Sequence, residues 1–250
     1  MFYAGIDIGS TAAKAVILDD GKKNILAKKL MPSGWNSKET ANELLTWLES
    51  QNFPRSDTRI IATGYGRVSV PYADKTLTEI TCHAKGAAFL AGDNLTVIDI
   101  GGQDTKIILL SNGRVLDFIM NDKCSAGTGK FLEVMSNRMG LTLSEFFALA
   151  ENGREVKISS MCTVFAESEI VSLMGLGTPR EDIACGAVGS VASKVAVLAG
   201  RKVNSGNYFL TGGFCEAALL VKKLSEVLNA DVKTCPEARF AGAIGAALLG

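Results

Sequence analysis

An internal duplication constrains the fold of this chain more than any other feature of its sequence. Residues 3–18 (YAGIDIGSTAAKAVIL) and residues 95–110 (LTVIDIGGQDTKIILL) align on Asp7 and Asp99. Both copies contain Ile-Asp-Ile-Gly and a lysine seven residues after the aspartate. Each copy predicts an apolar strand, a tight glycine turn and a second apolar strand. A repeated unit of this kind predicts an α/β protein built from two lobes of related topology.

Turn and cap signals extend this prediction along the chain. Each copy reaches a second turn, at residues 19–21 and 111–113, whose residues are typical of hairpins. A capping box beginning at Thr142 predicts a helix to about Glu151, and another beginning at Thr178 predicts a helix to about Ala199. A soft boundary at residues 90–94 divides the chain into an N-terminal lobe, 1–92, and a C-terminal lobe, 93–250.

The overall composition excludes several classes of protein. The 250 residues contain 26 basic and 26 acidic side chains, so we expect neither a nucleic-acid-binding nor a strongly acidic surface. The apolar stretch at residues 241–249 is too short to cross a membrane, and the N-terminus does not resemble a signal peptide. Six scattered cysteines without a CxxC motif do not suggest a disulfide scaffold, so a reducing cytoplasm fits best.

The paired glycine turns predict a nucleotide site. Small residues after each aspartate let backbone N–H groups approach phosphate oxygens closely. We expect Asp7 and Asp99 to hold Mg²⁺ through its waters, and Gln103 to orient a water molecule. A third turn near the C-terminus completes the site. The candidate nucleotide-binding residues are Gly9, Ser10, Thr11, Ala12, Lys14, Gly101, Gly102, Thr211, Gly212 and Gly213.

Two cysteines stand alone in segments rich in small residues. Cys124 lies in NDKCSAGTGK and Cys162 in SSMCTVFAE, and each is predicted to precede a helix with apolar residues at helical spacing. These helices are predicted to end near Gly140 and Gly175. One chain supplies two thiolates, half of what a [4Fe–4S] cluster needs, and a symmetric dimer would supply four. The other four cysteines, Cys82, Cys185, Cys215 and Cys235, are expected to be ordinary core residues.

The motifs DIGSTAAK, VIDIGGQD and LTGG resemble the phosphate-1, phosphate-2 and adenosine segments of the actin/hexokinase/Hsp70 ATPases. Within that superfold, the two cysteine segments resemble ATP-dependent activators of 2-hydroxyacyl-CoA dehydratases and their relatives in benzoyl-CoA reductase and double-cubane cluster protein reductases. The resemblance covers essentially the whole chain and implies two ribonuclease-H-like lobes around a nucleotide cleft.

The resemblance also implies cofactors, partners and a mechanism. Members of this family are homodimers with one bridging [4Fe–4S] cluster, held here by Cys124 and Cys162. We expect ferredoxin or flavodoxin to reduce the cluster, and ATP binding and hydrolysis to ADP to drive one electron into a partner iron–sulfur enzyme. That partner is a 2-hydroxyacyl-CoA dehydratase or a double-cubane cluster protein, and the sequence does not name its substrate.

Several residues have both a functional and a simpler interpretation. Glu167 either touches the nucleotide network or belongs to a polar helix face. Gly127 and Gly129 are expected to let the loop after Cys124 approach the phosphates. His83 beside Cys82 supplies too few ligands for zinc, so an ordinary helix residue is expected.

Two other classes of function stay open at this point. A small-metabolite kinase of the same superfold needs no cysteine pair, but 250 residues leave little room for its usual insertions. A filament-forming relative of actin needs long subunit-contacting insertions, which this sequence does not contain. A colourless protein that phosphorylates a metabolite would favour the kinase, and polymerisation without iron would favour the filament.

Overall fold

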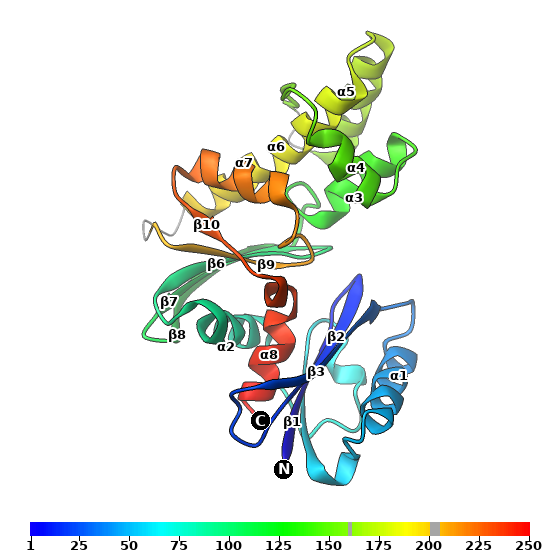
Figure 1. The fold of residues 1–250 in the computed structure, drawn as a ribbon. Helices are drawn as coiled ribbons and strands as arrows, with labels where there is room; N and C mark the ends of the chain where they lie inside the picture. The colour runs from blue at the N-terminus through cyan, green and yellow to red at the C-terminus, as the bar shows by residue number, and fades with distance from the viewer. Residues whose placement is uncertain (160–161, 201–205) are drawn as a thin grey trace. The chain divides into compact units, whose positions relative to one another are not determined.

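A computed structural model describes residues 1–159, 162–200 and 206–250, which form two compact units (Figure 1). Unit 1 contains Met1–Val97, Ile108–Phe118 and Pro236–Gly250, and unit 2 contains Ile98–Ile107 and Ile119–Cys235. The lobe ranges 1–92 and 93–250 stay a prediction. The compact units differ from them chiefly because the C-terminal segment belongs to unit 1.

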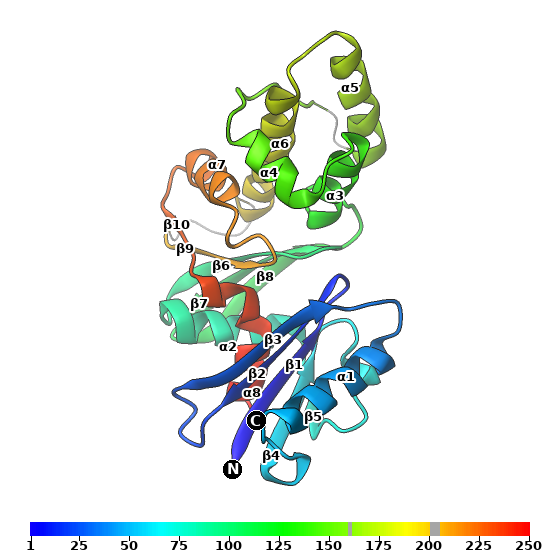
Figure 2. The same cartoon turned by 45° about the vertical axis from the view of Figure 1, so that its right-hand side comes forward.

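The first sheet has five strands in the order β3-β2-β1-β4-β5 (Figure 2). β1 pairs antiparallel with β2 and parallel with β4. In this register Asp7 lies opposite Lys14 on one side and Thr63 on the other, so the pairing itself assembles a polar site. The strands are β1 (Phe2–Ile8), β2 (Ala12–Leu18), β3 (Ile25–Pro32), β4 (Thr58–Thr63) and β5 (Lys75–Thr76).

The second sheet has the order β10-β9-β6-β7-β8. Taken from the other edge, β8-β7-β6-β9-β10, this order repeats that of the first sheet strand for strand. β6 takes the place of β1, β7 that of β2, and β9 that of β4. The duplication predicted from sequence is therefore confirmed as two α/β sheets of equivalent topology. The strands are β6 (Leu95–Ile100), β7 (Thr105–Ser111), β8 (Arg114–Asn121), β9 (Tyr208–Gly212) and β10 (Val232–Lys233).

Helices cover both faces of the first sheet. Leu44 and Leu48 of α1 (Ser37–Ser50) pack on one face with Ile6 of β1. On the other face, α8 (Ala241–Leu248) lies against β1 and also contacts α2 (Glu79–Ala91). A methyl group added at Gly5 would lie 1.8 Å from the Ala243 carbonyl oxygen, so only glycine permits this close packing. Three short 3₁₀ helices complete the unit: η1 (Arg55–Asp57), η2 (Arg67–Ser69) and η3 (Pro236–Phe240).

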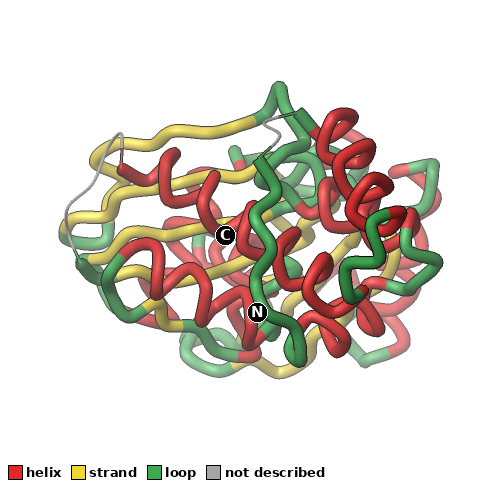
Figure 3. The backbone as a smooth tube through the Cα atoms, turned by 90° about the horizontal axis from the view of Figure 1, so that it is seen from above, coloured by secondary structure: helices red, strands yellow, loops and turns green. Residues whose placement is uncertain are grey.

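Unit 2 carries the remaining helices. Figure 3 draws all helices of the chain in red and its strands in yellow. Within unit 2, α6 contacts each of the other four helices, and α7 also contacts β10. The capping box at Thr142 is present, with the Thr142 N–H donating to Glu145 at 2.8 Å, and both helices predicted from capping signals are confirmed. The helices are α3 (Gly129–Arg138), α4 (Leu143–Ala150), α5 (Thr163–Gly175), α6 (Arg180–Gly200) and α7 (Ala218–Leu228).

The helix α5 differs from a core helix in its burial. The sequence predicts it correctly from Val164, Phe165 and other apolar residues at helical spacing. These residues are nevertheless exposed, Val164 at 66% and Phe165 at 68%, whereas Ala166 and Ile170 are buried. Val164 and Phe165 therefore lie at the surface of the single chain.

Within the described residues, α6 is the one helix whose length and composition would allow it to cross a membrane. Of its most apolar stretch, 67% is buried inside the protein. This burial, together with its contacts to four other helices, is typical of a core helix.

Candidate functional site

In unit 1, the first predicted aspartate is surrounded by positively charged and polar groups. Asp7 is the penultimate residue of β1 and its carboxylate is nearly buried. Lys14 Nζ lies 3.8 Å from Asp7 Oδ2. The turn between β1 and β2 is closed by a hydrogen bond from the Gly9 N–H to the Ala12 carbonyl oxygen at 3.2 Å. Ser10 and Thr11 are exposed at the tip of this turn, where their hydroxyl groups are accessible to a ligand.

In unit 2, the second aspartate has an equivalent setting with one additional charge. The Thr211 hydroxyl donates to Asp99 Oδ1 at 3.1 Å, and Lys106 Nζ lies 3.6 Å from Asp99 Oδ2. Lys106 also donates to Asp104 Oδ1 at 2.7 Å, so one buried ammonium serves two carboxylates. Asp104 takes the place of Ala12 in the first copy, and the sequence comparison did not single it out. Gln103 lies exposed at the turn.

A Thr-Gly pair packs closely against the aspartate in each unit. Gly64 and Gly212 follow the last buried threonine of β4 and β9, with φ angles of 87° and 90°. A methyl group added at Gly64 would lie 2.6 Å from Asp7 Oδ1, and one added at Gly212 would lie 2.8 Å from Asp99 Oδ1. The sequence predicted a role for the second pair, Thr211 and Gly212, but missed that Thr63 and Gly64 are its counterpart. Aligning the residues after β4 with those after β9 would have found it.

His83 also lies beside Asp7. We call the residues around Asp7 the first half-site and those around Asp99 the second. His83 is buried on α2, and its Nε2 lies 4.0 Å from Asp7 Oδ2. Gly242 of α8 packs against both side chains, since a methyl group there would lie 2.6 Å from Asp7 Oδ2 and 2.8 Å from His83 Nε2. The sequence gave no reason to connect His83 with Asp7, because only the packing of α2 in unit 1 brings them together.

The two isolated cysteines lie in neighbouring segments of unit 2. The hydroxyl groups of Ser125 and Thr163, each one residue after its cysteine, form a hydrogen bond of 2.8 Å. Both Cys124 and Cys162 are exposed. Ser160 and Met161, which belong to the second cysteine segment, lie outside the described residues.

Only one of the two cysteines directly precedes a helix. Cys162 is the N-cap residue of α5, as predicted. Cys124 instead lies in a loop five residues before the first residue of α3, so its predicted place at a helix start is wrong. Thr105 and Asn121 hold this loop: the Thr105 hydroxyl donates to the Gly127 carbonyl at 2.7 Å, and Asn121 Nδ2 donates to the Cys124 carbonyl at 2.9 Å.

The start of α3 connects the cysteine loop to the second glycine turn. The Gly129 and Lys130 N–H groups donate to the carbonyl oxygens of Gly101 and Gly102, at 2.9 and 2.8 Å. The two N–H groups at the start of α3 are therefore occupied by the turn that follows Asp99. A shift of this turn would move the beginning of α3 with it.

The remaining candidates have ordinary structural settings. Glu167 lies on α5, with its Oε1 3.5 Å from Arg138 Nε on α3, so it joins the helices that follow the two cysteines. Cys82, Cys185 and Cys215 are buried and Cys235 is partly buried, in agreement with a structural role. Burial raises the pKa of the Cys82 thiol to about 11. Within the described residues no group of three or more His, Cys, Asp or Glu side chains is arranged to hold a metal ion.

The duplicated sheets and their paired aspartate–lysine turns define an α/β ATPase of the actin-like class. Within that class, the chain belongs to the BadF/BadG/BcrA/BcrD ATPase family, which it matches over residues 4–250. As a member of this family the protein binds ATP and ADP.

Individual relatives are similar to this chain over nearly their full length. The (R)-2-hydroxyglutaryl-CoA dehydratase activating ATPase of Acidaminococcus fermentans is 45% identical over 251 residues, covering 99% of this chain and 96% of the relative. The crystal structure of component A of that dehydratase superimposes with a TM-score of 0.95 and 43% identity, covering 100% of this chain and 97% of the other. The activator of the 2-hydroxyisocaproyl-CoA dehydratase from Clostridium difficile with bound ADPNP has a TM-score of 0.93 and 39% identity, covering 100% and 94%.

Proposed function

We propose that this protein is an ATP-hydrolysing activator that passes a low-potential electron to a partner iron–sulfur enzyme of the 2-hydroxyacyl-CoA dehydratase or double-cubane cluster type. The observation that carries the proposal is the hydrogen bond between Ser125 and Thr163, which brings two exposed cysteine segments together in an ATPase fold. Two relatives of this chain, one a sequence and one a structure, are named as dehydratase activators, which supports the same role here.

The donor set fits a bridging [4Fe–4S] cluster. Cysteine thiolates are the usual ligands of such a cluster, which needs four of them. Cys124 and Cys162 are exposed, whereas the other cysteines are wholly or partly buried. Two ligands from each of two chains complete the set, and the cluster they hold would supply the chemistry of one-electron transfer.

The exposed side chains of α5 support a homodimer. Val164 and Phe165 lie two and three residues after Cys162 and are exposed in the single chain. A second copy that brings its own cysteines to the same cluster would cover this apolar surface. Burial of apolar surface is the main driving force for association of protein chains.

The two half-sites support the proposed nucleotide-binding residues. We assign Asp7 and Asp99 to Mg²⁺, which keeps most of its waters and needs few protein ligands. Gln103 and Glu167 are candidates for orienting the attacking water. The phosphates and adenosine are assigned to Gly9, Ser10, Thr11, Ala12, Lys14, Gly101, Gly102, Gly127, Gly129, Thr211, Gly212 and Gly213.

The bonds between α3 and the second glycine turn provide a route of coupling. Movement of Gly101 or Gly102 on hydrolysis would be transmitted to Gly129 and onward to the loop that carries Cys124. Nucleotide state would then change the environment of the thiolates, because ATP and ADP favour different arrangements of the turn. Ferredoxin or flavodoxin is the proposed electron donor, and a reducing cytoplasm the proposed location.

The test is iron and acid-labile sulfide measured per two chains after strictly anaerobic purification, with the visible spectrum. We expect about four of each, bleaching with dithionite, and loss of both in Cys124→Ser and Cys162→Ser while ATP binding persists. Cys235→Ser is the matched control and should keep its iron. A well-folded wild-type protein without iron, or a full cluster in either variant, would overturn the assignment.

A further inference from the structure

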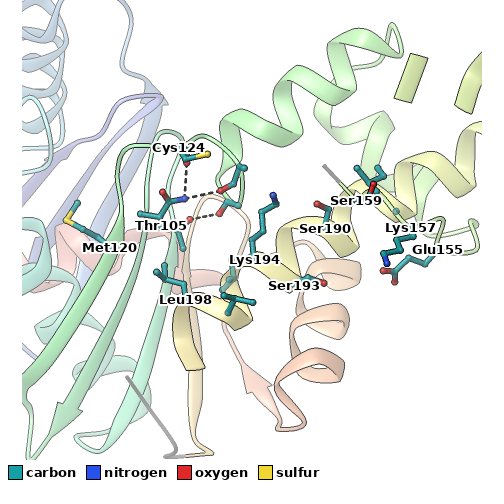
Figure 4. A pocket seen from close by; sticks show the side chains of 17 residues that line it. Thr105, Met120, Cys124, Glu155, Lys157, Ser159, Ser190, Ser193, Lys194 and Leu198 are labelled. Carbon is teal, nitrogen blue, oxygen red and sulfur yellow. Dashed lines mark hydrogen bonds between the residues drawn. The ribbon is translucent and has the colours of Figure 1, made fainter. Parts of the chain in front are cut away.

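A lysine that the sequence did not single out shares a cavity with Cys124. This cavity of unit 2 has a volume of about 870 Å³, and its lining includes Cys124, Gly127, Lys157, Ser190 and Lys194. Figure 4 shows Lys194 projecting from α6 into the space beside the cysteine loop, with Lys157 at the other end of the cavity.

Gly127 fixes the stem of this lysine. A methyl group added at Gly127 would lie 3.1 Å from Lys194 Cβ and 3.8 Å from its Cδ, so the loop packs directly along the side chain. Gly127 has a φ of 87°, which favours glycine, and its carbonyl is held by Thr105. The lysine stem and the cysteine loop therefore have a defined relative position.

Lys194 interacts electrostatically with both cysteines. Burial lowers the pKa of Lys194, and negative charge on Cys124 and on Cys162 opposes that effect. The Ser125–Thr163 hydrogen bond keeps the two cysteine segments next to each other. One partly buried positive charge thus acts on both predicted ligands of the same chain.

We propose that Lys194 is a positioning residue whose positive charge compensates the two thiolates and raises the reduction potential of the cluster that they hold. The inference rests on the proposed function. An Fe–S cluster with four thiolates is anionic, and its reduction adds one further negative charge. A nearby ammonium group stabilises the reduced form more than the oxidised form, because attraction grows with the charge.

The experiment is a dithionite titration of the anaerobically purified dimer, followed by EPR and visible absorbance. In Lys194→Met we expect the equilibrium constant for one-electron reduction to fall about tenfold, which is a shift of about 59 mV to lower potential. Lys194→Arg keeps the charge and should keep the wild-type potential. Lys157→Met removes a charge from the far end of the same cavity and should leave the potential unchanged.

A second readout needs no cluster. In the iron-free protein, the positive charge of Lys194 should attract an anionic reagent to the cysteines, so iodoacetate should alkylate Cys124 and Cys162 several-fold more slowly in Lys194→Met. If Lys194→Met holds a full cluster at the wild-type potential, or is alkylated at the wild-type rate, the inference is overturned and the proposed function stands. If the wild-type protein binds no iron, the proposed function fails, and the alkylation rates alone decide whether Lys194 acts on the thiols.

Discussion

At the residue scale, the ion pairs around Asp99 indicate that its carboxylate can be removed without unfolding the protein. Lys106 contacts both Asp99 and Asp104, so removal of Asp99 leaves the buried ammonium with one carboxylate. The fold should therefore tolerate the loss of Asp99, although breaking a buried ion pair entirely is costly.

We accordingly predict that Asp99→Ala reduces MgATP hydrolysis by about 100-fold, the usual order for loss of one electrostatic group at a reacting centre. The variant should keep its cluster colour, because Asp99 supplies none of the proposed thiolate ligands. Steady-state phosphate release and the visible spectrum measure the two effects. Hydrolysis at the wild-type rate would remove Asp99 from the metal site.

The glycines behind the aspartates give a stability prediction. Each of the variants Gly64→Ala and Gly212→Ala would place a methyl group against a backbone carbonyl oxygen. The distance is 2.4 Å to Ile8 for Gly64→Ala and 2.5 Å to Ile100 for Gly212→Ala. At φ angles near 90°, we expect each to lower the free energy of unfolding by at least about 2 kcal/mol, measured by urea denaturation.

Gly92→Ala is the matched control for these two variants. Gly92 also has a positive φ, 102°, but nothing lies within 4 Å of an added methyl group. Gly92→Ala therefore introduces backbone strain without steric overlap, and it should lower the free energy of unfolding by less than the other two variants. Equal losses in all three variants would mean that the close packing behind the aspartates contributes nothing.

At the element scale, local signals in the sequence predicted which segments form helices and strands. The patterns of apolar strand, glycine turn and apolar strand around Asp7 and Asp99 involve near neighbours in the sequence, as do the predicted capping boxes at Thr142 and Thr178. A single sequence therefore contains them. Contacts between distant residues left no such signal. The neighbourhood of His83 and Asp7, and that of Lys194 and Cys124, arise only when α2 and α6 pack in their units.

The helix α5 shows the limit of the apolar pattern. Apolar residues recur at helical spacing after Cys162, at Val164, Phe165, Val171 and Met174, and the helix predicted from them is present. The pattern does not say what covers their side chains, which are exposed. The position of α3 shows a related limit. Its predicted start after Cys124 was too early, because Gly129 begins the helix where its N–H bonds to Gly101.

That contact leads to a prediction about coupling. In Gly129→Ala the added methyl group would lie 2.6 Å from Phe214 and 3.0 Å from the Gly101 carbonyl oxygen, so the helix start must shift away from the turn. We expect the effect of ATP on the accessibility of the cluster to fall by at least about half, since an interaction lost at one contact weakens coupling without abolishing it.

The measurement is the rate at which an iron chelator bleaches the cluster in the presence of ATP or ADP. Gly140→Ala, just beyond the other end of α3, is the control, since nothing lies within 4 Å of its added methyl group. If Gly129→Ala retains the full difference between the two nucleotides, the coupling follows another route.

At the scale of the whole molecule, assembly and cluster retention should be linked. Phe165 is 68% exposed and lies three residues after Cys162. A charge at this position would oppose burial in a dimer. We predict that Phe165→Asp is monomeric by analytical ultracentrifugation at micromolar concentration and holds no iron.

The control for this variant is Val227→Asp on α7, where the side chain is 43% exposed and far along the chain from both cysteines. It should remain dimeric and keep its iron. A dimeric Phe165→Asp protein with a full cluster would show that α5 is not the contact surface.

The energetic demand on such an assembly is moderate. Lowering a one-electron potential by about 200 mV costs about 5 kcal/mol, at about 1.4 kcal/mol per 59 mV. No covalent intermediate is required for the hydrolysis that offsets this cost, because phosphoryl transfer depends on positioning and electrostatic stabilisation.

The place of α8 has a consequence for how the protein is made. This helix packs against β1 through Gly5, yet the ribosome synthesises it long after β1, once almost all of unit 2 has emerged. During translation the face of the first sheet that carries Val16 and Leu18 stays without its partner residues Ala243 and Ile244. The nascent chain therefore exposes an apolar sheet face for most of its synthesis. We expect aggregation, and the need for chaperones, to be greatest at this stage.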